Sequence, residues 1–154
     1  AGYFMTGDLG LLDAAGYLHF RGRLKELIKS GGINISPLEV EAYLRTHPKV
    51  QQAAVVGLPD ALKGEVPVAA VELRAGESLS AAELRSFCRA QLASYKIPVQ
   101  VVFLGPDEWP RTSTGKVQKM ALCEVIAARL RASTAPREEG APPCVPSSVE
   151  PGAR

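Results

Sequence analysis

The chain has 154 residues, of which 46% are hydrophobic and 22% charged, a balance typical of one globular domain with a buried core. The formal net charge is +2 without a basic stripe interleaved with aromatics, so nothing indicates nucleic-acid binding. No apolar run approaches the ~18 residues of a membrane span, and the N-terminus lacks a basic segment followed by a hydrophobic one. These features favour the cytoplasm or an organelle matrix.

A β-hairpin is the first predicted element. Residues 9–12 and 17–21 are short runs of apolar or alternating character, and residues 13–16 between them end in a glycine suited to a turn. Residues 23–25, which contain two basic side chains, then mark a boundary. A short strand over residues 27–29 follows and leads to a pair of glycines.

Three helices and three main strands are predicted after this boundary. Two of the helices start with a serine N-cap followed by glutamate three residues later, the pattern of a capping box, at Ser36 with Glu39 and Ser80 with Glu83. The helices are expected over about residues 37–46, 81–93 and 117–130. The strands are expected over residues 53–58, 66–73 and 99–104. The predicted fold class is α+β, a small three-stranded sheet with packed helices, preceded by the β-hairpin and a hinge.

The last part of the chain is predicted to be a tail. From residue 133 the sequence is rich in Pro, Gly, Ala, Ser and Glu, with almost no large apolar side chain. Such a segment cannot bury enough apolar surface to offset the entropy of ordering. Residues 132–154 are therefore expected to be disordered.

The cysteines and histidines do not predict a metal site. Cys88, Cys123 and Cys144 are widely separated and show no CxxC spacing, so neither a disulfide framework nor a zinc site is indicated. Cys88 and Cys123 fall on the apolar faces of predicted helices, where they are expected to be small buried hydrophobes. His19 and His47 have no partners at ligand spacing, and both are expected to be structural.

Residues 110–116, Pro-Arg-Thr-Ser-Thr-Gly-Lys, place a lysine on a turn suited to approach a phosphate. Three hydroxyl side chains precede Gly115, whose backbone can adopt conformations that a Cβ forbids, and Lys116 adds a mobile positive charge. A P-loop would need glycine at position 110 and Ser or Thr at position 117, where this chain has Pro110 and Val117. On its own this turn is more typical of a surface turn before a helix.

Two further segments, residues 3–10 and 22–41, precede this turn in the chain. Together the three resemble, in this order, the C-terminal part of the adenylate-forming superfamily, which includes acyl-CoA synthetases, aryl-CoA ligases, luciferases and peptide-synthetase adenylation domains. The resemblance covers about residues 1–130. It implies that residues 1–24 end a large N-terminal domain, with a nucleotide-ribose motif and the hairpin, and that residues 25–131 form a mobile C-terminal domain.

The resemblance assigns roles to individual residues. Lys116 matches the lysine that reaches the acyl carboxylate and the α-phosphate of ATP, where charge accumulates in the transition state. Asp8 would hold the ribose hydroxyls with help from Thr6, and Arg23 would be a second ribose or phosphate contact. Lys25 matches the pivot about which the small domain rotates between two poses.

The second pose would present a loop beside the tunnel through which coenzyme A arrives. Gly31, Gly32 and Asn34 match this loop, and at Gly32 a side chain would obstruct the incoming thiol. Three of these roles have a plainer alternative. For Asp8 it is a turn-capping role, and for Gly32 it is a β-turn. The plainer alternative for Arg23 is a surface salt bridge to Glu26.

Other polar and aromatic residues receive structural assignments. Lys119 competes with Lys116 as the reactive lysine but is expected to be a solvated helix residue. Glu39 is assigned to the capping box and Glu41 to a favourable charge at the helix start. Two aromatic side chains are expected to anchor the lysine turn to the body, Phe103 and Trp109.

The resemblance implies the C-terminal part of an ATP-dependent acyl-CoA synthetase, a fatty- or aryl-acid CoA ligase, that makes acyl-AMP and then acyl-CoA. Its co-substrates would be ATP with Mg²⁺, which the large N-terminal domain mainly binds, a carboxylic acid and CoA. Because Ala1 is not a methionine and the phosphate loop and acyl pocket are absent, the chain is expected to be a fragment that is inactive alone. The alternatives are an adenylation domain that loads a carrier protein and a non-catalytic, stand-alone binding module.

Overall fold

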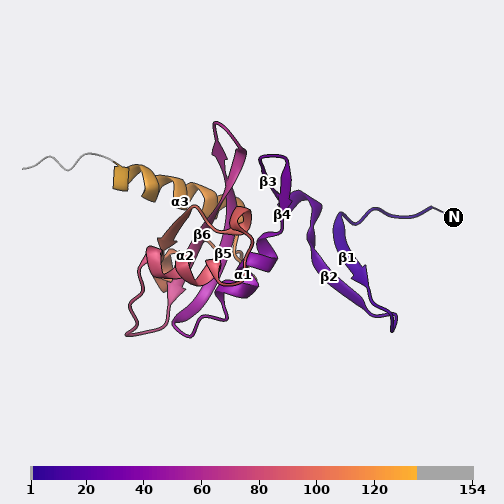
Figure 1. Ribbon diagram of the computed structural model, residues 1–154, viewed down its shortest axis with the longest axis horizontal. Coiled ribbons are helices and arrows are strands. Elements are labelled where there is room, and N and C mark those ends of the chain that lie inside the picture. The colour runs from indigo at the N-terminus through magenta and orange to yellow at the C-terminus, as the bar shows by residue number, and fades with distance from the viewer. Residues whose placement is uncertain (1, 135–154) are drawn as a thin grey trace, which may run out of the picture.

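The computed structural model describes residues 2–134, in which an N-terminal hairpin stands beside a layered body of helices and sheet (Figure 1). Strands β1 (Asp8–Leu12) and β2 (Leu18–Arg23) pair antiparallel, as predicted. Asp13 organises the turn between them, because its carboxylate accepts the backbone N–H groups of Ala15 and Tyr17 and bonds the ring of His19. The bond with His19, followed by the one from Tyr17, holds the pKa of Asp13 below its usual value.

A single 3₁₀ turn, η1 (Leu24–Glu26), connects the hairpin to a mixed sheet of five strands. The strands are β3 (Ile28–Ser30), β4 (Ile33–Ile35), β5 (Val50–Asp60), β6 (Gly64–Leu73) and β7 (Gln100–Phe103). Strand β6 is central: it pairs antiparallel with β5 along its length, antiparallel with β3 at its first residue, and parallel with β7. Strand β4 pairs with β3 at the edge.

The predicted α+β class is confirmed, and the sheet is wider than the three main strands expected. Those three strands correspond to β5, β6 and β7, and the two short strands β3 and β4 extend the sheet to five. Gly31 and Gly32 have φ values of +55° and +80°, which allow a two-residue turn between paired strands. Part of the segment expected to be the CoA-side loop therefore forms strand β4, which runs back alongside β3.

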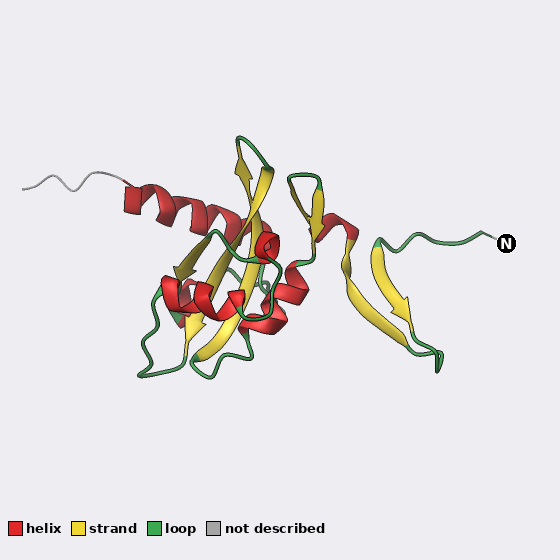
Figure 2. Ribbon diagram, in the orientation of Figure 1, coloured by secondary structure: helices red, strands yellow, loops and turns green. Residues whose placement is uncertain are grey.

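Two apolar clusters cover the two faces of the sheet. Successive side chains in a strand point to opposite faces, so β5 sends Ala53 and Val55 to one face and Ala54 and Val56 to the other. The first cluster packs against helices α1 (Pro37–Leu44) and α2 (Ala81–Arg89), and the second packs against α3 (Lys119–Thr134). Figure 2 shows the helices around the central strands.

One of the two predicted capping boxes is present. Ser80 and Glu83 cap α2 reciprocally, and the bond from the Ser80 hydroxyl lowers the pKa of Glu83. The box predicted at α1 is wrong, because the Ser36 hydroxyl donates instead to the carbonyl of Arg21 in β2. Glu39, assigned to that box, pairs with Lys96.

The helix ends differ from the expected ones by a few residues. Helix α3 starts at Lys119 because Val117 still forms an antiparallel bridge with Arg111. It continues to Thr134, so residues 132–134 are helical, whereas residues 135–154, the rest of the predicted tail, lie outside the described residues. Within residues 2–134, no helix has the length and apolar character needed to cross a bilayer.

The cysteines and histidines in the described part have structural surroundings. Cys88 is buried and Cys123 half-buried in the two clusters, and burial raises the pKa of both thiols. Cys144 lies outside the described residues. His19 bonds Asp13 in the hairpin, and His47 packs edge-on against an aromatic ring of α2.

Candidate active site

The predicted lysine turn is a closed loop held by its own hydrogen bonds. Thr112 N–H donates to the carbonyl of Lys116 and Gly115 N–H donates to the carbonyl of Thr112, both at 2.8 Å. The Lys116 N–H donates to the Thr112 hydroxyl, and Gly115 turns the chain with φ of +81°. Lys116 is exposed, and its ammonium has no ion-pair partner among residues 2–134. A fixed backbone thus presents an unpaired positive charge to solvent.

Arg111 braces this turn against the sheet, a role that the sequence analysis missed. Its guanidinium donates to the carbonyl of Gly115 at 3.2 Å and to the side-chain oxygen of Gln52 in β5 at 2.7 Å. Because Gln52 is 59 residues away in the chain, no local pattern indicates this contact. Arg111 therefore links the lysine turn directly to the central hairpin of the body.

The aromatic residues expected to anchor the turn are divided between the two clusters. Trp109 is buried with the second cluster, next to the start of the turn, and Phe103 packs in part against the first cluster from β7. Trp109 thereby fixes the chain just before the turn begins.

The three residues predicted to bind the nucleotide lie together at the end of the hairpin next to η1. Asp8 and Arg23 face each other across β1 and β2, and the Arg23 guanidinium donates to the Asp8 carboxylate at 3.1 Å. The Asp8 N–H donates to the Thr6 hydroxyl. Arg23 thus pairs with Asp8 and not with Glu26, the partner in the plainer alternative. Thr6 and Asp8 line a recess of about 380 Å³.

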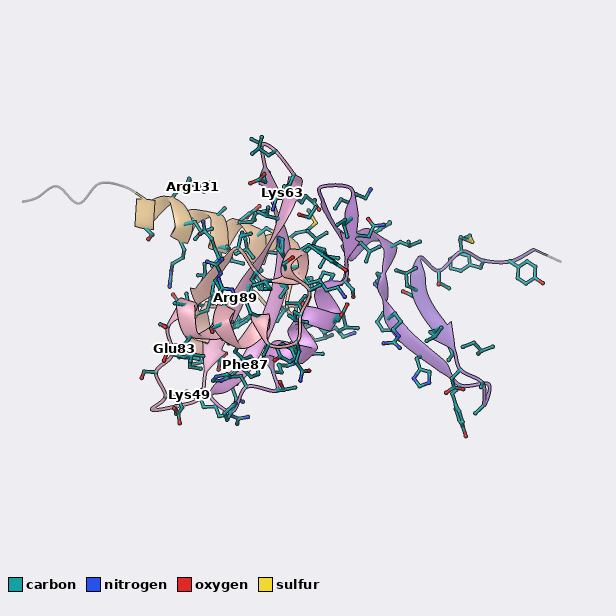
Figure 3. The ribbon with its side chains drawn as sticks, viewed as in Figure 1. Lys49, Lys63, Glu83, Phe87, Arg89 and Arg131 are labelled. Atoms are coloured by element: carbon teal, nitrogen blue, oxygen red, sulfur yellow. The ribbon has the colours of Figure 1, made fainter. Side chains whose placement is uncertain are left out.

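The loop predicted to face CoA is the turn between β3 and β4. Gly31 N–H donates to the carbonyl of Lys63 at the tip of the β5–β6 hairpin. Lys63 is labelled in Figure 3. Asn34 is exposed in β4, opposite Lys29. A Cβ at Gly31 or Gly32 would meet no atom of the described residues within 4 Å. Within this part of the chain, the positive φ angles alone account for both glycines.

The predicted hinge residue, Lys25, is exposed in the middle of η1.

The expectation that Lys119 is a solvated helix residue is wrong. Lys119 forms ion pairs with Glu26 at 3.1 Å and with Glu41 at 3.0 Å. Glu41 is buried and its carboxylate also accepts the N–H of Val55, so it is more than a helix-start charge. Isolated charges in sequence carry no signal of such a network, because its members come from three separate elements.

The described residues offer no metal-binding group. No cluster of three or more His, Cys, Asp or Glu side chains within residues 2–134 is arranged to hold an ion. The charged groups of the candidate site are instead the pair of Arg23 with Asp8 at the hairpin and the unpaired Lys116 on its braced turn.

Comparison with known proteins places this geometry in a family. The family model described as the AMP-binding enzyme C-terminal domain matches residues 39–116, about half of the chain. The chain belongs to this family. The match extends from within α1 to the lysine of the braced turn, so strands β5, β6 and β7 and Lys116 lie within it, whereas β3 and β4 precede it.

Relatives of this C-terminal domain are CoA ligases of the adenylate-forming superfamily. The oxalate–CoA ligase of Saccharomyces cerevisiae is 44% identical over 125 residues, which are 81% of this chain and 23% of that protein. The 2-succinylbenzoate–CoA ligase of Geobacillus kaustophilus is 45% identical over 125 residues, 81% of this chain and 25% of that protein. The chain therefore spans about a quarter of the length of the curated relatives it matches.

A solved structure shows the same fold. The ATP-bound MatB of Rhodopseudomonas palustris superimposes with a TM-score of 0.74 at 41% identity, covering 80% of this chain and 24% of that one. This similarity confirms the α+β architecture of a C-terminal domain of adenylate-forming enzymes.

Proposed function

We propose that this chain acts as the C-terminal part of an ATP-dependent acyl-CoA synthetase and supplies Lys116 to the adenylation step. The observation that carries this proposal is the exposed, unpaired Lys116 on a turn fixed by Arg111 and by internal hydrogen bonds. A preorganised positive charge lowers the energy of a transition state in which anionic groups approach one another. Membership of the family and the CoA-ligase relatives support the same conclusion.

The proposed reaction has two halves. A carboxylate oxygen attacks the α-phosphorus of ATP, a new C–O–P link forms, and pyrophosphate leaves; Lys116 would neutralise the oxygens that gather charge. The thiolate of CoA then attacks the acyl carbon, the thioester forms, and AMP leaves. Mg²⁺ would arrive with ATP and be held mainly by a large N-terminal part, as would most of the nucleotide.

Different parts of the chain serve the two halves in this proposal. Residues 1–24 belong to the large part, where Asp8 with Thr6 binds the ribose and Arg23 a ribose or phosphate oxygen. Residues 25–131 rotate about Lys25, so that either Lys116 or the loop of Gly31, Gly32 and Asn34 faces the substrates. The exposed position of Lys25 in a single 3₁₀ turn supports this pivot, because a short connection can absorb a large backbone change.

The acid and the compartment are part of the proposal. We expect a fatty or aryl acid, on the similarity of residues 33–41 to the ligases for those acids, and action in the cytoplasm or an organelle matrix. A panel of acids of different chain length and aromaticity, tested for acyl-CoA formation, checks the acid class. Transfer to a carrier protein in place of CoA would favour the carrier-loading alternative.

The decisive experiment separates the half-reactions in a chimera of this chain with the large N-terminal part of a CoA-ligase relative. Lys116→Ala should lower adenylation, followed by pyrophosphate exchange, by about 100-fold or more. Thioester formation from supplied acyl-AMP should survive. Arg89→Ala, an exposed cation on α2 that Figure 3 labels, is the matched control and should change neither step. Equal loss of both steps in Lys116→Ala would contradict the proposal.

The loop variants test the other pose in the same chimera. Gly32→Leu should leave adenylation near normal and block thioester formation. Gly76→Leu, at φ of +79° in the loop between β6 and α2, controls for the strain of a side chain at positive φ. Lys25→Pro should leave one half-reaction intact by fixing the pivot. The chain alone should form no acyl-CoA. Robust acyl-CoA synthesis by the chain alone would show that it does not need a large N-terminal part for activity.

A further inference from the structure

Lys119 connects three elements that are distant in the chain. Its ammonium lies 3.1 Å from a carboxylate oxygen of Glu26 in η1 and 3.0 Å from one of Glu41 in α1, while Lys119 itself opens α3. The pair with Glu26 spans 93 residues. An ammonium has three donors, so one lysine can hold both carboxylates at once.

Glu41 makes one end of this connection rigid. Its side chain is only 8% exposed, and the oxygen that faces Lys119 also accepts the N–H of Val55 in β5 at 2.9 Å. A buried carboxylate needs such partners, because an unpaired charge is costly to remove from water. Lys119 is therefore held in place by the body before it reaches Glu26.

Glu26 makes the other end an attachment to the hinge. It directly follows Lys25, and its ion pair with Lys119 joins η1 to α3. The first turn of α3 and the hinge also line one recess, which includes Lys25 and Met120. The lysine turn ends three residues before Lys119, so this contact lies beside the proposed catalytic residue.

We propose that Lys119 is a positioning residue that fastens η1 to the body, so that the pivot at Lys25 and the turn bearing Lys116 move as one unit. The inference rests on the proposed function and deepens it. The CoA-side loop follows η1 directly through β3 and keeps its place through the chain itself. Lys116 is 91 positions from Lys25, by the numbering of the sequence, so its place relative to η1 depends on tertiary contacts, among them the pair of Lys119 with Glu26. Loosening this contact should therefore affect adenylation more than thioester formation.

Glu26→Gln is the variant of choice, because it removes one charge at an exposed site and leaves the pair of Lys119 with Glu41 intact. The matched control is Glu77→Gln, which breaks the exposed pair with Lys49. The side chains of Glu26 and Glu77 are 44% and 42% exposed. Figure 3 labels Lys49 at the lower edge of the body, away from η1.

The first measurement is backbone amide exchange in the 154-residue chain, resolved by NMR and corrected for intrinsic rates. An exposed ion pair of this kind stabilises by roughly 0.2–1 kcal/mol, which corresponds to about a 1.4- to 5-fold change in an opening equilibrium. Glu26→Gln should raise exchange at residues 26–28 by that factor, and Glu77→Gln should leave it unchanged. In a Lys119→Met background, Glu26→Gln should have no further effect. Unchanged exchange in Glu26→Gln overturns the fastening.

The second measurement follows the two half-reactions in the chimera. Glu26→Gln should lower pyrophosphate exchange by about two- to fivefold and leave thioester formation from acyl-AMP unchanged. Lys119→Arg, which keeps the charge, should retain adenylation better than Lys119→Met. Equal loss in both half-reactions, with faster amide exchange, would mean that the contact only stabilises the hinge and would overturn the positioning role.

These arms separate failure of this inference from failure of the proposed function. If Lys116→Ala leaves adenylation intact, the proposed function is wrong, whereas amide exchange still decides whether Lys119 fastens η1. If Lys116→Ala abolishes adenylation and Glu26→Gln changes neither exchange nor rates, only the inference is wrong.

Discussion

The hairpin and the body of this chain differ in how far they bury their apolar side chains. In the body, β5 and β6 bury alternate residues on both faces, under α1 and α2 on one side and α3 on the other. The hairpin exposes large apolar side chains, namely Leu11, Leu12, Tyr17, Leu18 and Phe20, each more than half exposed. Figure 1 shows it beside the body, joined through η1. The body is therefore stabilised by its own core, whereas the hairpin is held by local bonds.

Truncation of a core side chain should show the contrast most strongly. Ile126→Ala removes a fully buried side chain between α3 and the sheet and should cost about 2–5 kcal/mol of unfolding free energy. Phe20→Ala in the hairpin should stay within about 0.5 kcal/mol. Urea unfolding of both variants, followed by circular dichroism, measures the two costs. Similar costs would mean that the hairpin packs as firmly as the body.

The Lys119 network should give the next largest effect, at the junction of the two regions. Lys119→Met leaves the buried Glu41 without its cation and should cost about 1–3 kcal/mol. Lys49→Met, which breaks an exposed pair with Glu77, should cost at most about 1 kcal/mol. Urea unfolding of both variants at the same ionic strength measures the two losses of unfolding free energy. Equal values would show that Glu41 is satisfied by Val55 alone.

The two serines that precede α1 and α2 sharpen the comparison further. Ser80→Ala removes a helix cap and should cost about 1 kcal/mol. Ser36→Ala removes only a bond to the hairpin and should cost a few tenths of that. Thermal unfolding of both variants tests the order, and the reverse order would mean that the hairpin contact matters more than the cap.

The capping box also predicts a pH dependence. The folded-state pKa of Glu83 lies below its unfolded value near 4.5, mainly because the Ser80 hydroxyl donates to the carboxylate. Its contribution is therefore present above pH 4.5 and is lost as the pH falls through the folded pKa. The stability difference between Ser80→Ala and the parent should shrink below pH 4.5. A difference that stays constant down to pH 3 would argue against the charged bond.

Removal of the hairpin should have the smallest effect. A chain lacking residues 1–22 loses the bond from Ser36 to Arg21, the bond from Leu24 to Gly7 and the exposed pair of Arg23 with Asp8, none of which belongs to the core. Its melting temperature should therefore fall by less than about 4 °C. Differential scanning calorimetry provides the measurement. A larger fall would show that the body needs the hairpin to fold.

Several features of the fold could be predicted from local patterns in the sequence. Alternating and apolar runs indicated the hairpin and the strands β5, β6 and β7, and the serine–glutamate pair at α2 indicated its cap. The same pattern at α1 failed, because the Ser36 hydroxyl donates to the carbonyl of Arg21 in another element and accepts no N–H of the helix. A local motif is reliable only where no distant group competes for its atoms.

The candidate site divides in the same way. The order of three motifs predicted roles for Lys116, Asp8 and Arg23 by resemblance to a family, and the structure brings Asp8 and Arg23 together as an ion pair. The brace of Arg111 on Gln52 was not predictable, since the two are 59 residues apart and neither type of side chain specifies a partner.

The sequence by itself determined the fold class, the main elements and the position of Lys116 at the end of the lysine turn. Periodicity, glycine positions and motif order depend on neighbours within a few positions, which the chain fixes directly. Only the tertiary structure decided that Lys119 joins η1 to a buried Glu41 and that β4 completes the sheet. Which charges meet, and which are desolvated, depends on how distant elements pack, because ion pairs gain their strength from geometry and burial.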